Sequence, residues 1–83
     1  MNEAELLQRI TVNPGIFGGK PIIRGMRMAV EHILGMLSAG STAESILERY
    51  PDLEAEDIQA ALVYARRVVG RERVEPPFVD STT

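Results

Sequence analysis

The sequence predicts a mainly α-helical domain, in which three short helices of the helix-turn-helix class follow an extended N-terminal arm. Apolar stripes with helical spacing recur between residues 28 and 70, and tight turn signals separate them. Residues 1–27 lack this spacing and contain several Gly and Pro turn signals instead. Because 83 residues leave room for one small domain, we assign residues 28–70 to a single core. A bare three-helix bundle would show the same pattern, so both arrangements stay open here.

The arm contains two candidate strands. Residues 10–12 alternate in the manner of a β-strand, and the Asn-Pro-Gly turn signal at residues 13–15 ends them. A second turn at residues 18–21 leads to Ile-Ile at residues 22–23, which suits a second short strand. Since Pro21 cannot donate a ladder hydrogen bond, we expect this strand to be an edge strand or merely extended.

Capping signals mark where the first predicted helix ends and the second begins. The first helix, residues 29–39, has one apolar stripe at i, i+3, i+4 and i+7, formed by Val30, Ile33, Leu34 and Leu37. Gly40 stands where a left-handed C-cap residue is expected. Ser41 and Glu44 have the spacing of a capping box, which predicts the start of the second helix, and Pro51 predicts its end.

The third predicted helix begins near Ala55 and ends at Gly70. Acidic residues in its first turn and arginines near its last turn both suit the helix dipole. Residues 71–83 have no periodicity and include a Pro-Pro pair, so they predict a flexible tail or a partner-binding peptide.

The composition argues against an enzyme. There is no Cys, which excludes disulfides, zinc–thiolate sites and Cys nucleophiles. His32 is the only histidine, and no recognisable catalytic or metal partner accompanies it. The glycine-rich run before Lys20 departs from a phosphate-binding loop, because Pro14 replaces its first Gly and Pro21 its Ser or Thr. We therefore expect a binding protein without catalysis, cofactor or metal.

The sequence also indicates a cytoplasmic protein with no membrane partner. The N-terminus lacks the pattern of a signal peptide, and no apolar run reaches membrane-spanning length.

Charges are segregated along the chain although the net charge is only −3. Positive residues gather in the arm and near the end of the third helix, whereas the start of that helix is acidic and would repel phosphates. Domains of the helix-turn-helix class commonly bind DNA. If this one does, the predicted DNA contacts are the basic residues Lys20, Arg24, Arg27, Arg66 and Arg67. In the alternative, Arg24 or Arg27 pairs with a carboxylate inside the protein.

Residues 13–27 read Asn-Pro-Gly-x-x-Gly-Gly-Lys-Pro-x-Ile-Arg-Gly-x-Arg, and residues 57–65 read Asp-Ile-x-Ala-Ala-Leu-x-Tyr-Ala. With these motifs, residues 9–69 resemble the domain-of-unknown-function 433 family. Met26, Ala29 and Glu54 depart from its usual pattern, which affects helix boundaries and no proposed functional group. The resemblance implies a homeodomain-like helix-turn-helix fold.

The same resemblance implies the antitoxin of a type II toxin–antitoxin pair. Many members look like VapB-type antitoxins, which bind and neutralise a PIN-like ribonuclease toxin and bind the DNA of their own operon as autorepressors. A free-standing helix-turn-helix DNA-binding regulator without a toxin is the alternative. We expect a homodimer, because the core is small. We expect the tail to dock on the toxin through five residues, namely Arg71, Arg73, Val74, Phe78 and Val79.

Overall fold

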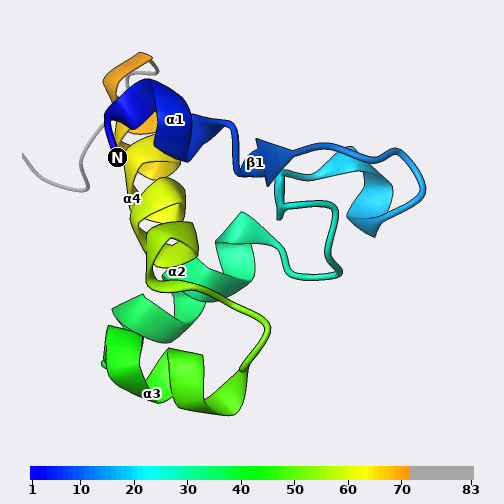
Figure 1. The fold of residues 1–83 in the computed structure, drawn as a ribbon. Coiled ribbons are helices and arrows are strands. Elements are labelled where there is room, and N and C mark those ends of the chain that lie inside the picture. Colours follow the sequence, from blue (N-terminus) through cyan, green and yellow to red (C-terminus); the bar gives the residue numbers. More distant parts are fainter. Residues whose placement is uncertain (72–83) are drawn as a thin grey trace, which may run out of the picture.

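The computed structural model describes residues 1–71, which form four α-helices and one small antiparallel sheet (Figure 1). In chain order the elements are α1 (Glu3–Leu7), β1 (Ile10–Thr11), a 3₁₀ turn (Phe17–Gly19), β2 (Ile22–Ile23), α2 (Val30–Ser38), α3 (Ala43–Arg49) and α4 (Ala55–Arg71). The prediction of a mainly helical chain is confirmed. The homeodomain-like arrangement of the helices stays a prediction.

The helix α4 is the element on which all the other helices pack. Figure 1 shows α1 crossing its later turns, while α2 and α3 lie toward its beginning. The buried core gathers side chains from β2, the loop after it, the three later helices and the connection between α3 and α4, namely Ile23, Met28, Val30, Ile33, Ile46, Leu53, Ile58 and Ala61. Val30 and Ile33 come from the stripe predicted for the first helix, and Leu34 and Leu37 of the same stripe pack half-buried beside them.

The two short strands pair in the register Ile10↔Ile23 and Thr11↔Ile22. Ile22 also forms an antiparallel bridge with Ala29. The sheet has two strands, so β2 is an edge strand of it, as expected, and the single bridge to Ala29 lies on its other side. Pro21 precedes the strand, where its carbonyl accepts the Val30 N–H at 3.0 Å and its missing N–H costs no ladder bond.

The arm begins with a helix that the sequence reading missed. Asn2 accepts the backbone N–H of Glu5 at 2.8 Å, and the Glu5 carboxylate accepts the Asn2 N–H in return. This capping box starts α1, and Leu6 is buried against α4. A helix of five residues is too short to show an apolar period, so its packing on α4 stabilises it rather than its own propensity.

The turn between α2 and α3 corrects the predicted N-cap. Gly40 has φ +100° and its N–H bonds to Leu37, while the Ser41 N–H bonds to Met36 at 3.0 Å, which together form a Schellman motif. Because Ser41 closes α2 in this way, Thr42 caps α3 instead, accepting the Ser45 N–H at 3.1 Å. The left-handed cap at Gly40 is confirmed and the capping box at Ser41 is wrong.

The helix α4 starts at Ala55 as predicted and continues through Gly70 to Arg71. Arg71 therefore belongs to a helix and not to the tail. No helix within residues 1–71 combines the length and the apolar character needed to cross a bilayer.

Candidate binding surfaces

Two arginines from the N-terminal segment converge on Asp57, in the first turn of α4. Asp57 is the one fully buried charged side chain within residues 1–71. Arg24 donates from Nε and Nη2 to the two carboxylate oxygens, at 3.0 and 2.8 Å, and Arg9 donates from Nη1 at 3.0 Å. The backbone N–H of Glu54 donates a fourth hydrogen bond at 2.8 Å, so the carboxylate also caps α4.

The backbone holds Arg24 in a conformation that favours this contact. Arg24 has φ +44° and Gly25 has φ +70°, both in the left-handed region. The Arg24 N–H bonds to the Arg9 carbonyl, and the Gly25 N–H bonds to Thr11 Oγ1, each at 2.8 Å. A non-glycine residue in this region costs about 1–2 kcal/mol, which the hydrogen bonds of Arg24 offset. The Arg-Gly pair thus joins the hairpin to α4.

Asp57 stays ionised at neutral pH. Burial alone would raise the pKa of its carboxyl, but the hydrogen bonds from Arg24, from the Glu54 backbone and from Arg9 lower the pKa below its ordinary value. The same pair raises the pKa of Arg24, against the opposing effect of burial. This centre is therefore a structural clamp that is charged at neutral pH.

Four of the five predicted DNA contacts are in ion pairs. Arg24 pairs with Asp57 at 2.8 Å, as the alternative interpretation expected. Lys20 pairs with Glu31 at 2.8 Å, and Arg66 and Arg67 both pair with Glu3 of α1. The five do not form one cationic face, because they lie on the hairpin side and at the far end of α4. DNA binding by these residues stays a prediction.

Arg27, the fifth predicted DNA contact, has no carboxylate within 4 Å among residues 1–71. Arg49, at the end of α3, shares this property. The two arginines line the same hollow, which the sequence reading did not foresee because they are far apart in the chain.

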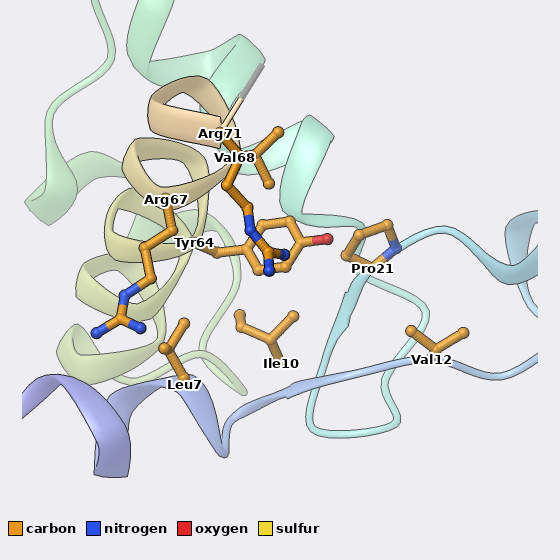
Figure 2. Close-up of a pocket in the computed structure, with 8 residues that line it drawn as sticks. All are labelled: Leu7, Ile10, Val12, Pro21, Tyr64, Arg67, Val68 and Arg71. Atoms are coloured by element: carbon orange, nitrogen blue, oxygen red, sulfur yellow. The ribbon is translucent and has the colours of Figure 1, made fainter.

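One open surface hollow lies between α1, the hairpin and the last turns of α4 (Figure 2). We name it the α4 groove. Its volume is about 740 Å³, and its walls are formed by Leu7, Ile10, Val12, Pro21, Tyr64, Arg67, Val68 and Arg71. The Val12 side chain is 63% exposed and that of Val68 is 37% exposed, so apolar surface faces the solvent here.

Figure 2 shows the Arg71 side chain reaching across the α4 groove beside the Tyr64 ring. Arg71 has no ion pair within residues 1–71, whereas Arg67 at the other wall is held by Glu3. Arg71 is thus the one predicted toxin contact that the structure describes. The other four predicted contacts, Arg73, Val74, Phe78 and Val79, lie outside the described residues.

The second hollow lies between the hairpin turn, α2 and α3, and we name it the Arg27–Arg49 pocket. Its volume is about 710 Å³, and the lining side chains include Phe17, Arg27, His32, Arg49 and Tyr50. The His32 and Tyr50 rings meet edge to face, with their Nε2 and Oη atoms 3.1 Å apart. Within residues 1–71 no group of three His, Asp or Glu side chains is placed to hold a metal ion.

Comparison with known proteins identifies the family. Residues 10–65 match the family described as "Protein of unknown function (DUF433)". The chain belongs to the DUF433 family. It is 40% identical over 67 residues to the "Uncharacterized protein y4eO" of Sinorhizobium fredii, covering 78% of this chain. The chain spans only 30% of the length of that relative.

A solved structure shares the fold. The crystal structure of a DUF433 member protein from Anabaena variabilis superposes with a TM-score of 0.70 and 32% identity, over 82% of this chain and 68% of that one. The match to the DUF433 family includes Arg24 and Asp57, so the clamp lies inside the family region. The family match ends at residue 65, so it does not include Val68 and Arg71 of the α4 groove.

Proposed function

We propose that this DUF433 protein is an antitoxin, which binds and neutralises a PIN-like ribonuclease toxin. The observation that supports the proposal is the α4 groove, which presents apolar side chains and Arg71, an arginine without an ion pair among residues 1–71, on one open surface. A partner that covered it would remove exposed Val12 and Val68 from water, which favours association. In this proposal the protein acts by binding and not as an enzyme.

Charge complementarity favours a nuclease as the occupant. A PIN-like ribonuclease gathers carboxylates around magnesium, and a guanidinium binds such carboxylates in a bidentate manner. Arg71 lines the groove, which supports the proposal that it makes this contact. Arg73 follows two residues later in the chain. Displacement of the metal by these arginines would inhibit the toxin, while the apolar groove supplies binding energy.

Autorepression is the second part of the proposal. In a homeodomain-like arrangement, α4 would be the helix that enters the major groove. Its first turn holds Glu56 and the buried Asp57, which leaves little positive charge for phosphates. We therefore assign the operator contact to Arg27, which has no ion pair among the described residues, in a cytoplasmic homodimer that presents two copies of it.

A free-standing DNA-binding regulator is the second candidate. The Arg27–Arg49 pocket favours it, because two arginines without ion pairs among residues 1–71 face the solvent together and need no toxin. The two candidates differ in the partner, so a toxin-inhibition assay separates them.

The test co-expresses this chain with the product of the adjacent gene, checks that the two co-purify, and measures whether this chain inhibits ribonuclease activity of that product. We expect Val68→Asp and Arg71→Glu to abolish inhibition, because each places negative charge in the α4 groove. Leu62→Asp is the matched control: Leu62 is an exposed apolar residue of the same helix, about 120° around the helix axis and about 9 Å along it from Val68. It should leave inhibition intact.

Truncation after Gly70 adds a second comparison. It removes Arg71 and the tail, and it should preserve helical circular dichroism while losing inhibition. Full inhibition by Val68→Asp would show that the α4 groove is not the toxin contact. Full inhibition by the truncated chain would show that the toxin contact lies on the helices and not on Arg71 or the tail.

A further inference from the structure

The Arg27–Arg49 pocket combines two kinds of side chain that proteins use together to bind nucleotides. Phe17, His32 and Tyr50 supply aromatic rings, and Arg27 and Arg49 supply positive charge. Aromatic rings stack on bases of any sequence, and guanidinium groups bind the phosphates between them. The pocket has the size range of small-molecule sites, at about 710 Å³.

Phe17 is held in the solvent at a conformational cost. Its φ is +49°, in the left-handed region that a bulky L-residue rarely adopts, and its side chain is 47% exposed. The turn around it is closed by the Gly19 N–H to Ile16 bond at 3.1 Å and the Lys20 N–H to Phe17 bond at 3.3 Å. Strain of this kind concentrates at ligand-binding sites, and here it keeps an aromatic ring at the mouth of the pocket.

The arginines are available because nearby carboxylates are engaged or distant. Glu31, which lines the pocket, is paired with Lys20 at 2.8 Å. Asp52 lines only the adjoining hollow and lies beyond 4 Å from both arginines. Phosphate oxygens can therefore approach Arg27 and Arg49 without displacing an ion pair formed within residues 1–71.

We propose that the Arg27–Arg49 pocket binds single-stranded nucleic acid, with a base stacked on Phe17 and phosphates on the two arginines. The proposal goes beyond toxin neutralisation, and it differs from the duplex contact assigned to Arg27 above. The bases of a duplex are stacked on one another, so Phe17 reaches a base face only where the strand is unpaired.

The neighbouring hollow favours a strand over a free nucleotide. It has a volume of about 390 Å³ and shares Arg27, Met28, Arg49 and Tyr50 with the larger pocket. The shared residues place the two hollows side by side, so a second nucleotide of the same strand can lie in the smaller one.

The test measures fluorescence anisotropy of a fluorescein-labelled twelve-nucleotide oligothymidylate in low salt. Phe17→Leu keeps an apolar side chain but removes the ring, and it should weaken binding roughly fivefold to a hundredfold. Arg27→Gln and Arg49→Gln should each weaken binding and lower the slope of log affinity against log salt by about 0.7. Unchanged melting temperatures would show that these exposed positions alter binding and not folding.

Arg71→Gln is the charge-matched control, because it removes one positive charge from the α4 groove instead of the pocket. It should bind the oligonucleotide as the wild type does, while toxin inhibition, measured separately, is lost. The proposal is overturned by oligonucleotide affinities that are equal for wild type, Phe17→Leu and Arg27→Gln. Equal affinity for the duplex of the same sequence, or equal competition by thymidine monophosphate, also overturns the assignment to a strand.

Discussion

Replacing Asp57 with asparagine would test the clamp between the hairpin and α4. The substitution keeps the size of the side chain and one oxygen that can accept the Glu54 N–H, but it removes the charge shared with Arg9 and Arg24. Breaking a buried ion pair by removing one partner costs about 3–5 kcal/mol. The Arg24 side chain is 36% exposed, so water compensates part of this loss. We expect a loss of about 2–3 kcal/mol.

Thermal denaturation followed by circular dichroism measures this loss. For a domain of this size each kcal/mol shifts the melting temperature by about 4–8 °C, so Asp57→Asn should melt roughly 10–20 °C lower than wild type. Glu31→Gln is the control, because it breaks the Lys20–Glu31 pair, whose side chains are 59% and 75% exposed. It should leave the melting temperature essentially unchanged. Equal melting temperatures for Asp57→Asn and Glu31→Gln would show that the ion pairs of Asp57 do not stabilise the fold as we infer.

The effect should depend on pH in one direction. Because the folded pKa of Asp57 is lowered, its contribution is fully present above the pKa of the unfolded chain, about 4. It is lost as the pH falls below that value and through the folded pKa. The difference in stability between wild type and Asp57→Asn should therefore be largest near neutral pH and shrink in acid. A difference that stays constant down to strongly acidic pH would contradict the charged clamp.

Further substitutions test the other structural inferences by the same denaturation assay. Leu6→Ala should destabilise the protein by about 2–3 kcal/mol, because Leu6 is the buried contact of α1, and a smaller effect would mean that α1 is not anchored on α4. Gly25→Ala should cost about 1 kcal/mol through strain alone, since φ is +70° and no atom lies within 4 Å of the added methyl group. Gly35→Ala, at an open position inside α2, should instead stabilise the protein by up to about 1 kcal/mol.

Features set by neighbouring residues were predictable from the sequence. The apolar period located α2 within one residue at each end, and the acidic residues of the first turn agreed with the observed start of α4 at Ala55. Gly40 marked its left-handed cap because few other residues adopt that conformation. The choice between Ser41 and Thr42 as N-cap was not predictable, since both are capping residues. The choice depends on how α2 ends: Ser41 takes part in the C-terminal turn of α2, so Thr42 becomes the N-cap of α3.

The helix α1 shows where sequence reasoning loses its signal. The Asn2–Glu5 capping box was present in the sequence, but five residues give no measurable period. Only the surface of α4 makes Leu6 a buried residue. The α4 groove has the same origin, because α1, the hairpin and α4 form it together.

The roles of the cations were decided by the tertiary structure alone. Arg24 meets Asp57 across 33 positions of sequence, and Arg66 meets Glu3 across 63. An arginine that pairs with a carboxylate and one that faces solvent look identical in a sequence, because an ion pair depends on distance in space and not on spacing along the chain. The sequence by itself was enough to recognise the basic, glycine-rich motif, the helices that follow it and the family resemblance. The fold decided that Arg24 holds the molecule together and that Arg27 and Arg49 share one open pocket.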